Sequence, residues 1–323
     1  MILARRSALA GLAATMLSGN AFAQASYPDR PIRVIIPFPA GGPTDVVARL
    51  LSPHLTAILG QQIVVENKPG ATGNIGTAMV AEAKPDGYTI LFSASTMAMA
   101  PALYGKQVGY DPVNGFEGIA YVASVPLILV VPTDGAKSIA ELADMLRKER
   151  GKYSYASSGN GGMIHLASYL FVEKAGGEAL HVPYRGSAPA MQDTLAGRHA
   201  FQIDTLGSSK GFIDAGRLRI LAVCTNERMA ALPDVPTVKE RTGFPLEVVT
   251  WYLIFAPAGT PQPIVDRLSV AINQAIKAPA IVDKAQALGM EMVQSTPESS
   301  KKFYQGQMAM WAPIVKASGA KVE

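Results

Sequence analysis

Three glycine-containing turns are the parts of this 323-residue sequence whose residue types could bind a ligand. They are residues 37–45 (PFPAGGPTD), 156–162 (ASSGNGG) and 184–189 (YRGSAP). Each follows a short strand-like run and precedes a stretch with helical periodicity. Glycine lets the backbone approach a ligand closely, and the unpaired amides and the dipole at a helix start favour an anion. One such segment is explained equally well as a structural turn, but three together predict a shared anion site.

The candidate ligand-binding residues lie in these turns, directly after them, or at the end of the strand at 200–203. Asp45 has two interpretations, because it either caps its helix or orients a water or a ligand hydroxyl. Arg185 either forms a salt bridge with the ligand or faces solvent. The expected ligand-binding residues are Phe38, Ala40, Gly41, Gly42, Thr44, Asp45, Ser157, Ser158, Gly159, Met163, Gly186, Ser187, Ala188 and Asp204.

Signatures of enzymes are missing from the sequence. It contains no GxSxG, no Walker lysine followed by Ser or Thr, and no HExxH, and none of its four histidines are spaced as a metal pair. The single cysteine, Cys224, follows the apolar run 220–223 and is interpreted as a packed residue rather than a nucleophile. We therefore expect no catalytic residue, no metal site and no cofactor.

The elements that position the turns alternate between strands and helices. Buried strands are predicted at 33–36, 63–65, 88–92, 127–131 and 248–255, with shorter ones before the second and third turns. Helix starts are predicted at Ser138 (a capping box), at Thr260-Pro261 and at Thr296-Pro297. Pro53 interrupts the first apolar helix and predicts a kink. Such alternation predicts an α/β protein with mostly parallel sheets that are flanked by helices.

Two crossings between domains are expected, near residues 124–126 and 242–245. They divide the chain into a discontinuous first lobe (24–124 and 246–323) and an inserted second lobe (125–245). Two crossings make a hinge, and a cleft between two α/β lobes is a common ligand site.

The N-terminus predicts a secretory signal peptide at residues 1–23. Arg5 and Arg6 precede a small apolar stretch, and Ala21-Phe22-Ala23 fits the rule for cleavage after Ala23. The arginine pair leaves two export routes open. The full sequence has 29 basic and 25 acidic residues. Cleavage removes Arg5 and Arg6 and therefore leaves 27 basic and 25 acidic residues. No basic cluster is interleaved with aromatic residues, so nucleic acid is not an expected partner.

The mature chain resembles the Bug/TctC family, the extracytoplasmic solute receptors of tripartite tricarboxylate-type transporters. The resemblance rests on motifs in order along the chain. They are residues 27–33 (YPDRPIR), 38–45, 66–71 (ENKPGA), 73–76 (GNIG), 84–89 (KPDGYT), 181–184 (HVPY), 186–190 (GSAPA), 232–238 (LPDVPTV) and 255–261 (FAPAGTP).

This resemblance implies a periplasmic protein with a Venus-flytrap fold that performs no covalent chemistry. It implies a carboxylate gripped by the turns at 40–45 and 186–188, with 157–159 and Asp204 completing the cleft. The implied partners are a small organic carboxylate and the large and small membrane subunits of a transporter, with a monomer as the default state. A sensory receptor that signals to a membrane protein is the alternative, because both roles need the same clamp.

The sequence departs from the family pattern after the second turn. Many members carry a polar sequence such as Thr-Pro-Ser-His where this chain has Gly162-Met163-Ile164-His165. Met163 either packs at the start of its helix or faces the cleft. If it faces the cleft, the far end of the ligand is expected to be apolar, as in an aromatic or branched acid.

Overall fold

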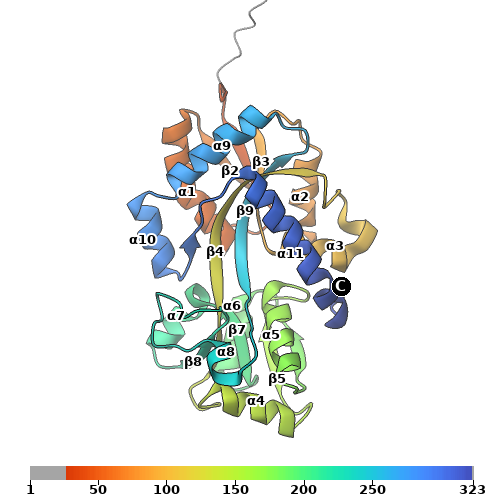
Figure 1. Ribbon diagram of the computed structural model, residues 1–323, viewed down its shortest axis with the longest axis vertical. Helices are drawn as coiled ribbons and strands as arrows, with labels where there is room; N and C mark the ends of the chain where they lie inside the picture. Colours follow the sequence, from red (N-terminus) through yellow and green to blue (C-terminus); the bar gives the residue numbers. More distant parts are fainter. Residues whose placement is uncertain (1–26, 322–323) are drawn as a thin grey trace, which may run out of the picture.

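The computed structural model describes residues 27–321, and the expected signal peptide lies outside them. The chain forms two α/β lobes, one above the other in Figure 1. Two long strands, β4 (Phe116–Pro132) and β9 (Val249–Pro257), run from one lobe into the other. We call the upper lobe of Figure 1 the first lobe and the lower one the second lobe. The predicted two-lobed α/β fold is confirmed.

The first lobe is built on a sheet with the strand order β2-β1-β3-β9-β4. Strands β2 (Ile63–Asn67) and β3 (Thr89–Ala94) run parallel to β1 (Ile32–Ile36), whereas β9 is antiparallel to both β3 and β4. The short β10 (Glu291–Met292) pairs with β4. The helices of this lobe are α1 (Pro43–Leu59), α2 (Asn74–Ala81), α3 (Thr96–Tyr104), α9 (Gln262–Ala275), α10 (Pro279–Ala287) and α11 (Pro297–Ala317).

Helices cover both faces of this sheet, because successive side chains of a strand point to opposite faces. Val34 and Ile36 belong to a core formed with α1, α9 and α10. Ile35, between them, belongs to a second core formed with α2, α3 and α11. Strand β1 is therefore buried on both sides, as its run of β-branched residues predicted.

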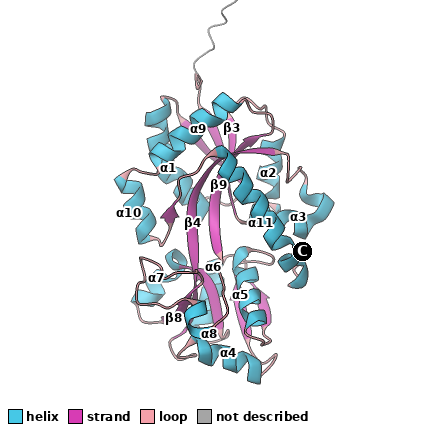
Figure 2. Cartoon of the chain, viewed as in Figure 1, coloured by secondary structure: helices cyan, strands magenta, loops and turns pink. Residues whose placement is uncertain are grey.

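The second lobe contains a sheet in which β5 (Ser154–Ser157) lies parallel to β6 (Leu180–Pro183) and β7 (Phe201–Thr205). Strands β7 and β8 (Leu218–Val223) pair antiparallel with β4. Its helices are α4 (Ile139–Lys148), α5 (Met163–Lys174), α6 (Ser187–Leu195), α7 (Leu206–Asp214) and α8 (Val238–Thr242). Figure 2 shows helices lying beside the strands in both lobes. In both sheets the parallel pairs come from the strand-helix alternation, and the crossing strands contribute the antiparallel pairs.

Strand β4 changes partner where the chain passes between the lobes. It pairs with β9 as far as Pro126, opposite Val249, and with β7 from Leu127, opposite Thr205. The sequence pattern identified only residues 127–131 of this strand. Its first part was missed because Gly118, Ala120 and other small residues weaken the β-branched signal there.

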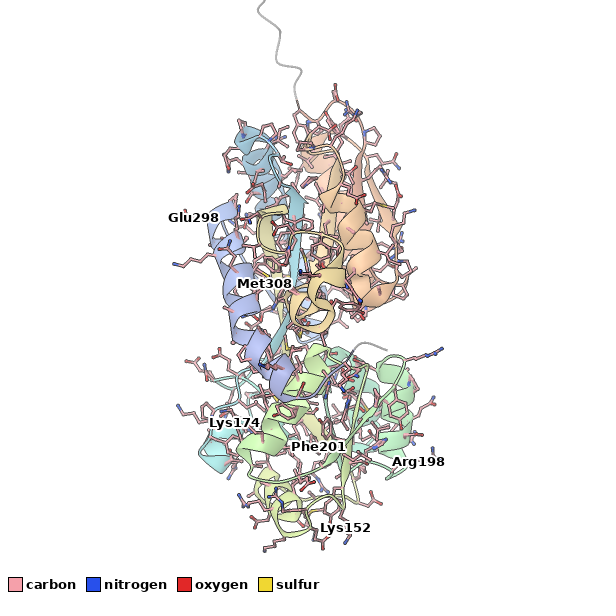
Figure 3. The ribbon with its side chains drawn as sticks, turned by 90° about the vertical axis from the view of Figure 1, so that its right-hand side faces the viewer. Lys152, Lys174, Arg198, Phe201, Glu298 and Met308 are labelled. Carbon is pink, nitrogen blue, oxygen red and sulfur yellow. The ribbon has the colours of Figure 1, made fainter. Side chains whose placement is uncertain are left out.

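The two lobes also share a hydrophobic core beside α11. Met99 of α3 and Trp311 of α11 pack in the same cluster as Leu166 and Phe201 of the second lobe. Figure 3 shows Phe201 inside the second lobe, whereas Lys152 and Arg198 lie at its outer edge. Burial across this boundary links the lobes in addition to the two crossing strands.

Predicted helix starts are confirmed at two positions and corrected at a third. Ser138 Oγ accepts the Glu141 amide and Thr296 Oγ1 accepts the Ser299 amide. The Glu141 side chain hydrogen-bonds the Lys137 amide, so the predicted capping box at Ser138 is incomplete. The prediction at Thr260 is wrong, because its hydroxyl donates to the Pro257 carbonyl and α9 begins at Gln262. Helix α1 continues past Pro53 to Leu59, and the predicted kink stays a prediction.

Candidate functional site

The first turn leads from β1 into α1, whose N-cap residue is Gly42. Glycine has no side chain, so the first amides of α1 receive no side-chain cap. Gly41 has φ of 78°, in the left-handed region that favours glycine. A Cβ built on Gly41 meets no atom within 4 Å, so this part of the backbone faces open space. The start of α1 can therefore receive an anion at close range.

Asp45 holds this turn in place through both of its carboxylate oxygens. Oδ2 accepts the Gly41 amide at 2.9 Å, and Arg49 Nε lies within 3.0 Å of both oxygens. Asn67 Nδ2 donates to Oδ1 and also to the Phe38 carbonyl. The hydrogen bonds of Asp45 therefore hold residues 38–41 in place. This role resembles the capping interpretation of Asp45 more than the interpretation as a ligand contact.

Asp45 remains ionised in this position. Burial acts to raise its pKa, but the hydrogen bonds from Arg49, the Gly41 amide and Asn67 outweigh burial and bring the pKa below its usual range. The Arg49 guanidinium also compensates the negative charge of Asp45 at this turn. Without this pairing, a carboxylate here would repel an anionic ligand.

The second and third turns are joined to each other by backbone hydrogen bonds. The Tyr184 amide donates to the Ser157 carbonyl, and the Gly186 amide donates to the Ser158 carbonyl. Gly162 and Gly186 are the N-cap residues of α5 and α6, and neither helix has a side-chain cap. The predicted turns of the second lobe thus form one surface with two uncapped helix starts.

Asp204 is the second-last residue of β7 and has no exposed surface. Its oxygens accept the Thr205 amide at 2.7 Å and the Gln202 side-chain amide at 2.7 Å. Burial raises the pKa of Asp204 above its usual range, against the opposing effect of these hydrogen bonds and of Ser187. Asp204 therefore lies close to Ser187, the first residue of α6.

Three hollows have walls from both lobes. The inner hollow measures about 210 Å³ and is lined by Gly41 and Pro43 of the first lobe and by Thr205 and Ser208 of the second. The distal hollow measures about 480 Å³. Thr72, Leu103, Tyr104, Ser158, Gly159, Tyr184, Arg185 and Lys321 line it. A larger hollow of about 660 Å³ lies between α10 and residues 229–231 and contains none of the predicted residues.

The other predicted residues are placed unevenly around these hollows. Ala40 and Ala188 are exposed, whereas Thr44 is only 6% exposed. Phe38 is half-buried and packs against the first-lobe core. Met163 is 4% exposed and lies in the core shared with α3 and α11, so its side chain lines neither hollow. Burial of Met163 removes the reason for expecting an apolar far end of the ligand.

Several residues that line the hollows were missed from the sequence. Thr72 and Tyr104 hydrogen-bond each other at 2.8 Å across the distal hollow's first-lobe wall. Thr72 and Ala71 have φ of 55° and 46°, although neither is glycine. Thr72 and Tyr104 carry no local sequence signal of a site, because they lie far apart in the chain and the fold brings them together.

The single cysteine, Cys224, is fully buried. Burial raises the pKa of Cys224 to about 12, so this thiol stays protonated near neutral pH. Within residues 27–321, no group of three or more His, Cys, Asp or Glu side chains could hold a metal ion. In the same range, no helix is both long enough and apolar enough to cross a membrane.

Comparison with protein families gives a match to the tripartite tricarboxylate transporter family receptor over residues 47–320. A "UPF0065 protein in tcbD-tcbE intergenic region" of Pseudomonas sp. (strain P51) is 40% identical, over 96% of this chain and 94% of its own. Protein BugT of Bordetella pertussis is 35% identical, over 98% of this chain and 96% of its own.

Solved structures similar to this chain include periplasmic binding protein BugD, which is 37% identical with a TM-score of 0.79. The adipate complex of Rpa4515 from R. palustris is 32% identical with a TM-score of 0.82. Both alignments cover 92% of this chain and 100% of the other. The malate complex of MatC from Rhodopseudomonas palustris is 28% identical with a TM-score of 0.78, over 90% of this chain and 100% of the other.

Proposed function

The chain belongs to the tripartite tricarboxylate transporter family of receptors, and from this membership we propose that it clamps a small carboxylate between its lobes. The observation that carries the proposal is the uncapped start of α1, α5 and α6, each with a glycine at the N-cap. Ser138, Thr205, Thr237 and Thr296 cap α4, α7, α8 and α11. Helices α2, α3, α9 and α10 also lack a side-chain cap, but none of them follows one of the three predicted turns. Uncapped amides at three helix starts suit a carboxylate, which supplies the missing acceptors. The adipate and malate bound by similar proteins have the same chemistry.

We propose that the far end of the ligand is anionic or polar. The residues that line the distal hollow include the cations Arg185 and Lys321 and no carboxylate. Two cations favour a second negative charge, since opposite charges attract more strongly in a partly desolvated cleft. This proposal replaces the expected apolar end, which depended on Met163 facing the cleft.

The hinge is proposed to lie at the two chain crossings. At the first crossing, β4 exchanges β9 for β7 between Pro126 and Leu127, close to the boundary expected at residues 124/125. At the second crossing, β9 begins at Val249, close to the boundary expected at residues 245/246. The first lobe would then comprise residues 24–124 and 246–323, and the second lobe residues 125–245. Rotation about these strands would bring the turn at residues 37–45 toward the turns at 157–162 and 184–189.

The biological setting proposed is the periplasm, with a signal peptide removed after Ala23. The proposed partners are the large and small membrane subunits of a tripartite tricarboxylate-type transporter, and the proposed free state is a monomer. A receptor of this kind needs no turnover, which agrees with the packed state of Cys224.

Thermal unfolding of residues 24–323 against a panel of mono-, di- and tricarboxylates and amino acids tests the proposal. A ligand at about a thousand times its dissociation constant adds about 4 kcal/mol of stability. The expected rise in Tm is several degrees, at about 2 °C or more per kcal/mol. We expect dicarboxylates to raise Tm more than monocarboxylates of equal length, and Arg185→Gln to remove that difference.

Gly41→Ala and Gly197→Ala provide a matched pair for this experiment. The two glycines have φ of 78° and 72°, and a Cβ at either meets no atom within 4 Å. Both variants therefore carry the same backbone strain, but only Gly41→Ala places a methyl group at the start of α1. Loss of the Tm rise in Gly41→Ala alone is the expected result. An equal ligand-induced rise in Tm in both variants would refute binding at this turn.

A further inference from the structure

Two histidines of the second lobe stack against each other beside the turn at residues 157–162. The rings of His165 on α5 and His181 on β6 are 3.6 Å apart between centroids and nearly parallel, at 5°. The Tyr155 ring of β5 stacks on His181 at 5.2 Å. His165 is only 2% exposed. The two imidazoles thus form a single packed unit, with His165 in the interior of the lobe and His181 half-buried on β6.

Each imidazole hydrogen-bonds a different atom of this turn. The Gly161 amide donates to His165 Nδ1 at 3.0 Å, so Nδ1 carries no proton and the ring proton is on Nε2. His181 Nε2 lies 2.6 Å from Ser157 Oγ, whose own proton goes to the Gly159 carbonyl at 2.9 Å. All these contacts are satisfied when His181 Nε2 donates to Ser157 Oγ. Both rings are then neutral.

We infer that His165 and His181 are positioning residues of the anion site, a role that rests on the proposed function. As a neutral stacked pair, they fix the Ser157 hydroxyl and the Gly161 amide, and thereby the whole turn that begins α5. The pair needs no contact with the ligand to do this. It acts by preventing the glycine-rich turn from adopting the many other conformations that glycine allows.

The charge state of the pair gives this role a measurable signature. Burial lowers the pKa of His165 to about 4, and burial together with His165 lowers the pKa of His181 to about 3. The titratable groups that face the pair are the two rings themselves and Tyr155. Among the described residues, no carboxylate or cationic side chain shifts either histidine. A proton on His165 Nδ1 would oppose the Gly161 amide and break the hydrogen bond.

The sign of the pH effect follows from these lowered values. Below the usual histidine pKa of 6.5, the unfolded chain binds protons that the folded chain excludes. The two neutral histidines therefore contribute their full stabilisation of the folded state above about pH 6.5, and this stabilisation is lost as the pH falls toward 4. The asparagine of His165→Asn cannot be protonated. Between about pH 6.5 and pH 4, the Tm of this variant is therefore expected to fall less than the Tm of the natural protein.

Amide hydrogen exchange of Gly161, resolved by NMR at pH 7 without ligand, tests the positioning role directly. His165→Asn keeps an acceptor near the position of Nδ1, whereas His165→Phe keeps a flat ring without an acceptor. His54→Gln, a change on α1 of the first lobe, is the control. We expect exchange at Gly161 to accelerate about tenfold in His165→Phe and to remain unchanged in the other two variants.

Unchanged exchange in His165→Phe would overturn the inference, and so would equal acceleration in His165→Asn. Titration with adipate and with malate then tests the connection to binding, with an expected loss of about tenfold in affinity for His165→Phe. Faster exchange without loss of affinity would overturn the role in ligand binding and leave the proposed function intact. If the natural protein binds neither acid, the failure concerns the proposed function, and the exchange result still decides whether the pair holds the turn.

Discussion

Asp45 holds the turn of the proposed anion site in place through contacts within the protein. From the sequence it could be a helix cap or a ligand contact. In the structure both oxygens are occupied by the Gly41 amide, Arg49 and Asn67, and the side chain is nearly inaccessible. A carboxylate fastens the turn, and its neighbouring guanidinium keeps the local charge from repelling an anionic ligand.

Asp45→Asn is expected to loosen this turn. The variant loses the ionic partner of Arg49, so the free energy of unfolding falls by about 1–3 kcal/mol and ligand affinity falls by about tenfold. The pKa of Asp45 is lowered, so its stabilisation is present at neutral pH and is lost as the pH falls below 3.8. Chemical denaturation at pH 7 and pH 3 measures both effects.

Asp214→Asn is the control for this substitution. Asp214 forms an i,i+4 pair with Lys210 in which both side chains are more than half exposed. The same change of charge there should alter the unfolding free energy by no more than about 0.5 kcal/mol. An equal loss in both variants would contradict a specific role for Asp45.

At the scale of elements, α11 links the C-terminal part of the chain to the crossing strands. Gln307 Oε1 accepts both indole N–H groups of the protein's two tryptophans, Trp251 on β9 and Trp311 on α11, each at 3.1 Å. Both tryptophans are at most 1% exposed. One amide oxygen therefore holds a helix against the strand that passes between the lobes.

Gln307→Leu should leave two buried donors without an acceptor. Each unsatisfied donor costs about 1–3 kcal/mol, so we expect the two together to lower the free energy of unfolding by about 2–6 kcal/mol. Gln305→Leu, on the same helix at an exposed position, should change this value by less than about 0.5 kcal/mol. Urea unfolding followed by tryptophan fluorescence measures both. Equal midpoints for the two variants would show that the shared acceptor does not stabilise α11.

At the scale of the whole molecule, the two lobes meet at a point beside the distal hollow. A Cβ added to Gly161 of the second lobe would lie 2.6 Å from Leu103 Cδ2 of the first. Such a distance is too short for carbon atoms, so the side chain or the lobe must shift. Gly161 thus allows the lobes to approach each other closely at this point.

Gly161→Ala is therefore expected to favour separated lobes and to weaken ligand binding several-fold. Gly216→Ala is the control, because Gly216 has a similar φ of 66° and a Cβ there meets no atom within 4 Å. Small-angle scattering should show a larger radius of gyration for Gly161→Ala only. Adding Leu103→Ala should restore compactness and affinity. If Leu103→Ala does not restore them, the losses of compactness and affinity in Gly161→Ala come from backbone strain and not from the contact between the lobes.

The sequence by itself determined the features that depend on neighbours along the chain. The strand-helix alternation, the glycine turns and the caps at Ser138 and Thr296 were all predicted, because each depends on residues within a few positions. The family resemblance gave the two-lobed architecture and the carboxylate chemistry. The exact start of α9 was predicted wrongly, since the Thr260 hydroxyl bonds back to Pro257.

The tertiary structure alone decided which side chains meet across distant segments. It buried Met163 against α3 and α11, turned Asp45 toward Arg49 and Asn67, and stacked His165 on His181. It also gave β4 two successive antiparallel partners. These outcomes depend on contacts between residues far apart in the chain, which no local pattern of residue types encodes. The sequence therefore identified the turns of the proposed site, and the fold determined which side chains hold those turns in place.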